Sequence, residues 1–179
     1  VEITNADPSH WGISAFVNKP LYSIDKFSVT FRTETNNTSE TMLEKKDSGW
    51  KFTEPFHASA NKEKVLFFLN SLISEKTEGF VRSPDKALNQ KLKDDWKVRI
   101  SLDSMGKRED VFILGTSGND KTYRAAQSSL SSTIFLINED FVTKKLSDLS
   151  TQLRERTVFN LDSETLQSIE IQKKQNFLK

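Results

Sequence analysis

The segment between residues 96 and 137 constrains the fold most, because it places several strand-like runs between turn residues. Residues 96–102 (Trp-Lys-Val-Arg-Ile-Ser-Leu) carry large apolar side chains at every second position. This alternation predicts a strand with one buried and one solvated face. Turn residues follow at 103–106 and at 117–120. Further strand-like runs lie at 111–114, 122–126 and 133–137. Four short strands joined by tight turns predict an antiparallel meander.

A second strand region lies upstream. Residues 27–31 alternate between apolar and polar side chains, and runs at 41–44 and 50–52 flank the turn residues 47–49. The turn ends in Gly49, whose backbone freedom suits a hairpin. The polar stretch 33–40 is predicted to be a mobile loop.

Helical spacing of apolar residues predicts a first helix. Its stripe consists of Val65, Phe68, Leu69, Leu72 and Ile73. Ser59 or Asn61 can cap the start by accepting a hydrogen bond from a backbone N–H. A second, shorter helix is predicted over 84–92, with Ser83 as its cap and Pro84 at its first position.

A third helix is predicted to begin near Asn138, with Glu139 and Asp140 in the first turn, where the helix dipole favours negative charge. Its apolar stripe consists of Val142, Leu146, Leu149 and Leu153. Strands dominate and cluster, and the helices lie between blocks of strands. We therefore expect an α+β fold with a largely antiparallel sheet, a meander plus a hairpin, and about three helices packed on it.

Composition excludes several functional classes. The chain has no cysteine, and its two histidines, His10 and His57, are far apart, so we expect no metal site and no cofactor. The formal net charge is +1 in 179 residues, which gives no strong field to attract nucleic acid. No apolar run is long enough to span a bilayer.

Patterns that resemble catalytic motifs have simpler explanations. Ser-x-x-Lys occurs at 104–107 across a predicted turn, and at 83–86 where Ser and Pro suit a helix start. Adjacent acidic pairs occur at 94–95, 109–110 and 139–140. Neighbouring residues point in different directions, so solvated or capping roles are favoured over paired acid and base catalysis. We expect no catalytic residues and no enzymatic activity.

The tryptophans differ in their surroundings. Trp50 and Trp96 lie in predicted strands with apolar partners on the same face, which favours core packing. Trp11 lies in an N-terminal segment without such a pattern. It is the one candidate ligand-binding residue, and packing back onto the sheet is the alternative.

A short pattern recurs near the two ends of the chain. Residues 21–25 (Leu-Tyr-Ser-Ile-Asp) and 158–162 (Val-Phe-Asn-Leu-Asp) share the order aliphatic, aromatic, small polar, aliphatic, aspartate. Chance similarity is one explanation, and an internal repeat is the other. We divide the chain into three parts: 1–19 as an N-terminal segment that could end a preceding module, 20–157 as the α+β module, and 158–179 as a closing strand or the start of a following repeat. A strand is predicted at 166–171.

Two segments resemble a bacterial family of domains of unknown function. Residues 50–55 (Trp-Lys-Phe-Thr-Glu-Pro) resemble its opening strand, and residues 154–162 (Arg-Glu-Arg-Thr-Val-Phe-Asn-Leu-Asp) resemble its second marker. The resemblance covers about residues 20–171. Asn61 stands where the family usually has Asp. The family's aromatic-Gly-Leu after the short helix is replaced by residues 92–96, so that loop is expected to differ.

The resemblance implies a setting more than a reaction. Members of the family are membrane-anchored, repeat-containing proteins encoded beside gliding-motility-type ABC transporters. It implies a non-enzymatic, extracytoplasmic interaction module, periplasmic or on the cell surface, anchored by a transmembrane helix outside this fragment. The implied partners are envelope proteins, such as an ABC transporter permease or accessory subunit. The alternative is a cell-envelope carbohydrate- or peptide-binding domain.

Overall fold

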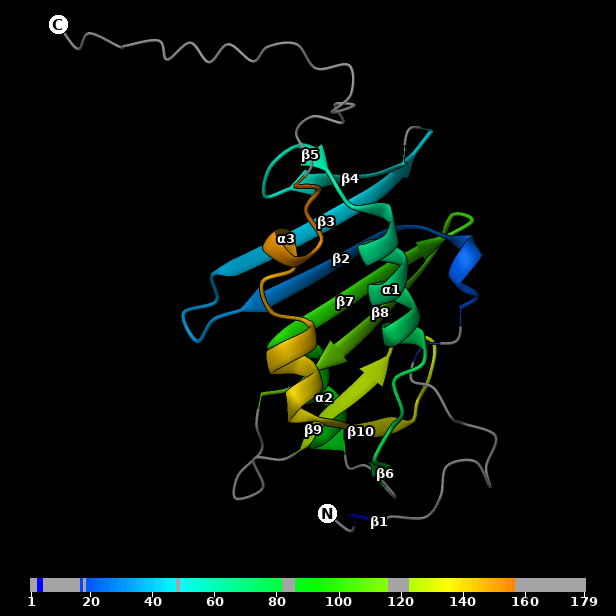
Figure 1. Cartoon of the computed structure of the whole chain (residues 1–179). Helices are drawn as coiled ribbons and strands as arrows, with labels where there is room; N and C mark the ends of the chain where they lie inside the picture. Colours follow the sequence, from blue (N-terminus) through cyan, green and yellow to red (C-terminus); the bar gives the residue numbers. More distant parts are fainter. Residues whose placement is uncertain are drawn as a thin grey trace, which may run out of the picture.

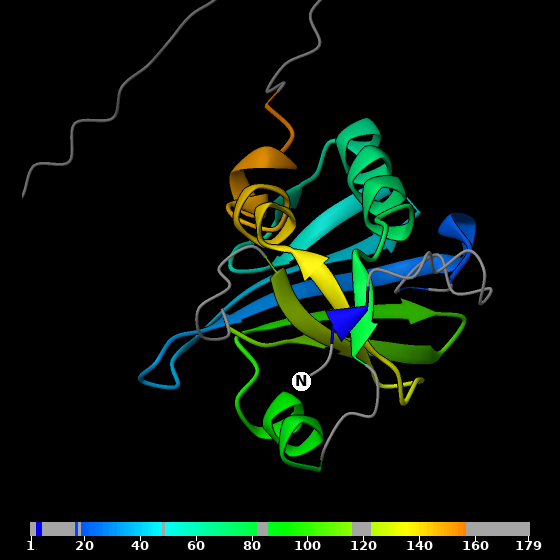
Figure 2. The same ribbon diagram turned by 90° about the horizontal axis from the view of Figure 1, so that it is seen from below.

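The computed structural model describes residues 3–4, 17, 19–47, 49–81, 86–115 and 123–156. Within these ranges the chain forms one large antiparallel sheet with helices on both faces (Figures 1 and 2). This confirms the α+β class and the antiparallel sheet. Trp11, the predicted cap Ser83 and the predicted strand 166–171 lie outside the described residues.

The sheet contains ten strands among the described residues, in the spatial order β1-β6-β10-β9-β8-β7-β2-β3-β4-β5. Every neighbouring pair is antiparallel. The strands are β1 (Ile3–Thr4), β2 (Ile24–Arg32), β3 (Thr38–Lys46), β4 (Gly49–Glu54), β5 (Ala58–Ser59), β6 (Gly79–Val81), β7 (Val98–Ser104), β8 (Lys107–Ile113), β9 (Tyr123–Ser128) and β10 (Ile134–Asn138).

The predicted meander is the series β7 to β10. Its first turn is tighter than the sequence indicates, because Asp103 and Ser104 still belong to β7, and Ser104 pairs with Lys107. Only Met105 and Gly106 form the loop, with φ angles of 50° and 73°. Strand β8 therefore begins four residues before the predicted start at Val111, in a polar stretch that alternation alone did not mark.

The upstream hairpin is β3–β4, with Lys46 paired to Gly49 and Gly49 at a φ of 117°. The prediction of a loop over residues 33–40 is wrong at the C-terminal end of that range. Residues 38–40 extend β3 and pair with residues 30–32 of β2. Threonine suits a strand, and the cross-strand hydrogen bond from Thr30 Oγ1 to Glu40 Oε1, at 3.2 Å, contributes to this pairing.

Helices cover both faces of the sheet (Figure 2). Helix α1 (Lys62–Ile73) begins at Asn61, whose side chain accepts a hydrogen bond of 3.0 Å from the backbone N–H of Lys64. Asn61, rather than Ser59, is therefore the cap. Helix α2 (Lys86–Asp94) lies on the opposite face and buries Leu92.

The third predicted helix is broken. Strand β10 runs to Asn138, a π-helical turn η3 (Phe141–Lys145) follows, and α3 (Leu149–Gln152) is a single turn. Between them Asp148 adopts a left-handed conformation, with φ of 52°, which aspartate tolerates better than most residues. The four residues of the predicted stripe are nevertheless all buried. The apolar pattern was therefore right about the buried face and wrong about a continuous helix.

Two apolar clusters fill the space between these layers. The larger lies between the sheet and α1, η3 and α3, and includes Phe27, Trp50 and Phe68. The smaller lies around α2. Trp50, 4% exposed, lies in the larger cluster, as predicted. Trp96 is also buried, at 5% exposed, but it belongs to neither cluster, and its ring packs against the guanidinium groups of Arg32 and Arg99.

The last described residues extend the sheet past β5. The backbone N–H of Asn61 donates to Leu153 O at 2.8 Å, and that of Glu155 donates to Ser59 O at 3.1 Å. Arg154 forms an isolated antiparallel bridge with Ala60. Within the described ranges, no helix is long and apolar enough to cross a membrane.

Candidate functional site

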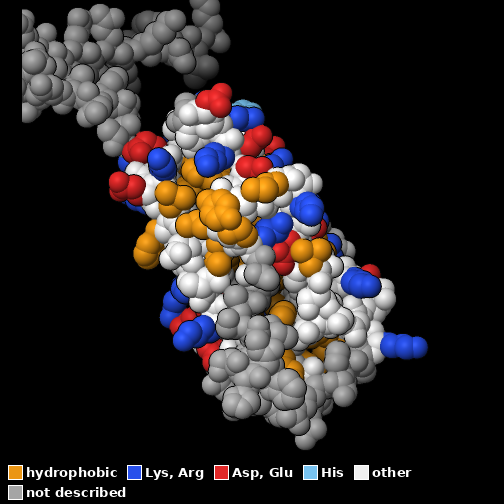
Figure 3. Space-filling model, turned by 90° about the vertical axis from the view of Figure 1, so that its right-hand side faces the viewer, with side chains coloured by type: hydrophobic (Ala, Val, Ile, Leu, Met, Phe, Trp, Pro, Cys, Tyr) orange, Lys and Arg blue, Asp and Glu red, His pale blue; other side chains and the backbone are white. Residues whose placement is uncertain are grey.

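Large apolar side chains are exposed on helix α1 and on the turn that packs beside it. Tyr22 lies in the short 3₁₀ turn η2 (Leu21–Ser23), which packs beside α1, and it is 79% exposed. Leu66 and Phe67 lie on α1 and are 36% and 77% exposed. We call these three residues the apolar surface. Figure 3 shows hydrophobic side chains gathered on one face of the molecule among charged ones. Exposed apolar residues that gather in one place mark interaction sites more often than single ones do.

The phase of α1 explains why Leu66 and Phe67 are exposed. The buried residues Val65, Phe68, Leu69 and Leu72 occupy the helix face toward the sheet. Residues 66 and 67 fall between the positions of that stripe, and each residue of an α-helix is rotated by about 100° from the last. They therefore point away from the core, Phe67 more fully than Leu66.

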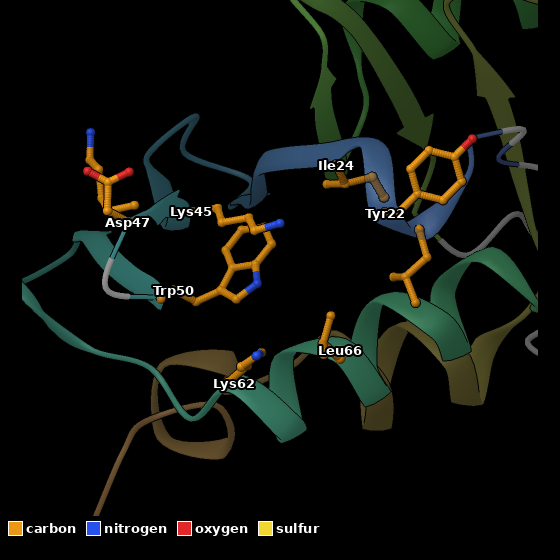
Figure 4. Close-up of a pocket in the computed structure, with 10 residues that line it drawn as sticks. Tyr22, Ile24, Lys45, Asp47, Trp50, Lys62 and Leu66 are labelled. Atoms are coloured by element: carbon orange, nitrogen blue, oxygen red, sulfur yellow. The ribbon is translucent and has the colours of Figure 1, made fainter.

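A groove of about 650 Å³ lies next to the apolar surface. Its walls come from η2, the start of β2, the β3–β4 hairpin and α1 (Figure 4). Its lining residues are Leu21, Tyr22, Ile24, Lys45, Lys46, Asp47, Gly49, Trp50, Lys62 and Leu66. The volume falls in the usual range for sites that hold small molecules or a few side chains.

Two lysines direct their ammonium groups into the groove. Lys45, from β3, extends beside the indole of Trp50, and Lys62, from the first turn of α1, approaches from the other side (Figure 4). Asp47 lies away from this space. Among the described residues, neither ammonium forms a hydrogen bond or an ion pair. The groove thus combines an apolar floor with two available positive charges.

The third lysine of the groove is already paired. Lys46 Nζ lies 2.8 Å from Glu44 Oε2. This hydrogen bond from Lys46 holds the pKa of the Glu44 carboxyl below its usual range. Lys46 is therefore less available to a ligand than Lys45 and Lys62.

A smaller hollow of about 230 Å³ lies on the other side of Phe67, between α1 and the segment η3–α3. Its two lysines from η3 are paired: Lys144 with Asp140 at 2.7 Å, and Lys145 with Glu75 at 2.6 Å. It offers less space and fewer available charges than the groove.

Among the described residues, the motifs that resembled catalytic sites do not form one; the motif at 83–86 lies partly outside them. Ser104 and Lys107 face each other across the β7–β8 turn, and Ser104 Oγ donates to Ser23 Oγ at 2.7 Å. Glu139 forms an ion pair with Arg124, and Asp140 pairs with Lys144. Asp94 and Asp95 are exposed, and Asp94 Oδ2 accepts a hydrogen bond of 2.6 Å from Gln90.

The pair Glu109–Asp110 departs from its predicted solvated role. Glu109 is 3% exposed, and its Oε1 accepts a hydrogen bond of 2.6 Å from Ser128 Oγ. Its Oε2 is buried without a hydrogen-bond partner among the described residues. Asp110 is instead held by Arg108 at 3.0 Å. Adjacent residues of a strand face opposite sides of the sheet, so the two carboxylates do not share a site.

The remaining candidates are the two histidines and Trp11. No group of three or more metal-binding side chains occurs in the part of the chain that the structure describes. His57 is exposed there, and His10 and Trp11 are outside it.

Sequence reasoning missed the residues that form the groove. Two signals were available. Leu66 and Phe67 are large apolar residues at the solvent phase of a strongly patterned helix, and Tyr22 is an aromatic residue next to a central strand. The convergence of Lys45 and Lys62, 17 positions apart in the sequence, depends on tertiary structure and had no local signal.

Comparison with known proteins identifies a family. No curated protein and no solved structure matches this chain. The model of the family described as "Domain of unknown function (DUF4340)" matches residues 50–178. This range includes Trp50, Lys62 and Leu66 of the groove, whereas Tyr22 and Lys45 precede it. Because the match covers most of the chain, the protein belongs to the DUF4340 family of domains of unknown function.

Proposed function

We propose that this chain is a non-enzymatic protein-interaction module, which binds a partner through the apolar surface and the adjoining groove. One observation carries the proposal: Tyr22 and Leu66 are exposed where they line a groove of about 650 Å³, and Phe67 is exposed next to Leu66 on α1. Aromatic residues are enriched at protein interfaces, and those that fill pockets on a partner supply much of the binding energy.

The scaffold is suited to presenting such a surface. Helix α1 is fixed to the sheet by four buried side chains, and η2 leads directly into the central strand β2. Binding side chains on rigid elements lose less conformational entropy when a partner docks.

The partner class is proposed from the family resemblance of the sequence. We propose that the module belongs to a membrane-anchored accessory protein of an ABC-type transporter system, with the module outside the cytoplasm. A permease or an accessory subunit is the proposed partner. If the module is repeated along the parent protein, linkage would raise the effective concentration of each binding surface.

Site-specific photo-crosslinking of the membrane-anchored parent protein in intact membranes tests the proposal. A photoreactive residue at Phe67 is expected to give an adduct with a transporter subunit. The same residue at Lys51 is the control, because Lys51 is exposed on β4. Equal adducts from both positions, or none with a transporter subunit from Phe67, would contradict the proposal. Robust hydrolase or transferase turnover by the purified protein would contradict its non-enzymatic part.

A carbohydrate- or peptide-binding domain of the cell envelope is the second candidate. The exposed Tyr22 ring at the groove favours it, because aromatic rings can stack on sugars or extended peptides. This function predicts that cell-wall glycan fragments change the fluorescence of Trp50, which lines the same groove. The change should be lost in Tyr22→Ala. An unchanged spectrum at saturating glycan would count against this candidate.

A further inference from the structure

We infer that the groove recognises an acidic residue that lies beside a large apolar residue in a segment of the protein partner. The inference rests on the proposed function, and it adds the chemistry by which the partner is selected. Its basis is the placement of two ammonium groups above an apolar floor (Figure 4).

The two positive charges come from opposite walls. Lys45 belongs to β3 and Lys62 to the first turn of α1, and both ammonium groups point toward the space beside Trp50 (Figure 4). Asp47 is the one acidic side chain among the described residues of the groove lining, and it lies at the far end and away from this space. A carboxylate between the two lysines would therefore meet two attractive charges and no nearby repulsive one from the lining.

Two surrounding features strengthen the preference for an anion. The N-terminal end of α1 carries the positive end of the helix dipole, and Lys62 is its first residue. Trp50 and Ile24 are buried beneath the groove, so water is excluded on one side and charge interactions are less screened there. Glu63 lies in the same turn and is exposed, but it does not line the groove.

The other end of the groove is apolar and would bind the apolar side chain of the ligand. Tyr22 and Leu66 line it (Figure 4). An aliphatic or aromatic side chain placed there would cover the exposed parts of Tyr22 and Leu66 while its acidic neighbour reached the lysines. A basic segment would bring like charges together, so the site is expected to reject it.

Peptide display against the full 179-residue chain tests the inference. The wild-type protein is expected to enrich peptides with Asp or Glu close to Leu, Phe or Trp. The Lys45→Glu/Lys62→Glu variant is expected to bind these peptides at least tenfold more weakly, and to enrich peptides with Lys or Arg beside the same apolar residues. Lys51→Glu/Lys91→Glu is the matched control, because it changes the net charge equally at exposed lysines outside the groove.

A neutral variant keeps the test independent of effects on folding. Lys45→Gln/Lys62→Gln, with an unchanged denaturation midpoint, is expected to lose the acidic preference without gaining a basic one. Failure of the wild type to enrich any peptides, enrichment without acidic residues, or an acidic preference that survives either double substitution would overturn the inference. Adducts from Phe67 in membranes would still support the proposed function in that case, so the two failures are distinguishable.

Discussion

The side-chain amide of Asn61 donates a hydrogen bond of 3.0 Å to Glu155 Oε2, across 94 positions of sequence. The same side chain accepts from the backbone N–H of Lys64 and so caps α1. Asn61 therefore joins the helix that carries the apolar surface to the last described residues. Because one side chain makes both the cap and the long-range contact, a substitution at Asn61 that removes its donor or its acceptor is expected to lower the stability of the fold.

Replacing Asn61 tests this double role. Asn61→Ala should lower the free energy of unfolding by about 2 kcal/mol, because it removes a helix cap and a hydrogen bond to a charged group. Urea denaturation of the purified chain measures the change. A loss below about 0.5 kcal/mol would show that water replaces both contacts.

Asn61→Asp separates the two roles. Aspartate caps helices as well as asparagine does, but it would place a carboxylate against Glu155. We expect a smaller loss than for Asn61→Ala, and recovery when Glu155→Gln is added, since Gln can donate to the new carboxylate. No recovery in this double variant would mean that the contact with Glu155 contributes little.

The β7–β8 turn offers a stabilising substitution. Met105 and Gly106 both have positive φ angles, as in the two-residue hairpin turns that prefer Asn-Gly, and Met105 is 75% exposed. Met105→Asn should therefore raise the free energy of unfolding by about 0.5–1 kcal/mol. Thermal unfolding checks this. An equal gain from Met105→Leu would point to a cause other than backbone conformation.

Ser128 is predicted to matter because it supplies the hydrogen bond to buried Glu109. It also accepts the backbone N–H of Leu130 at 3.1 Å. Ser128→Ala should lower the free energy of unfolding by about 2 kcal/mol, because the buried Glu109 carboxyl would lose this hydrogen-bond donor. Adding Glu109→Met should restore much of the loss, since an apolar side chain there needs no donor. If the double variant is as unstable as Ser128→Ala, the loss of stability comes from packing at residue 128 and not from the lost hydrogen bond.

The elements that local patterns could predict are those with strong periodicity. Alternation in residues 96–102 marked β7, and helical spacing from Val65 to Ile73 marked α1. The polar strand segments 38–40 and 107–110 were not predicted, because their strand conformation depends on pairing with neighbouring strands. The left-handed Asp148 had no signal either, since aspartate is equally ordinary at a helix start or in a turn.

The candidate site was harder to predict than the fold. Its residues come from η2, β2, β3, β4 and α1, and only the tertiary structure brings Lys45, Lys62 and Tyr22 to one groove. Burial also changed the role of Glu109, whose sequence neighbours are charged and suggest a solvated position. Sequence patterns therefore predicted the buried residues much better than the residues of the candidate binding site.

Two neighbouring phenylalanines give the sharpest comparison between folding and function. Phe68 is 6% exposed and packs against Phe27 with 5.5 Å between ring centroids, whereas Phe67 is 77% exposed. Phe68→Ala should lower the free energy of unfolding by about 3–5 kcal/mol, because it opens a cavity in the core. Phe67→Ala should change it by less than about 0.5 kcal/mol. Denaturation of both variants, combined with partner capture from membranes, completes the test. We expect Phe67→Ala to keep its stability and to lose capture; a large loss of stability would instead assign Phe67 to the fold, and unchanged capture would remove it from the binding surface.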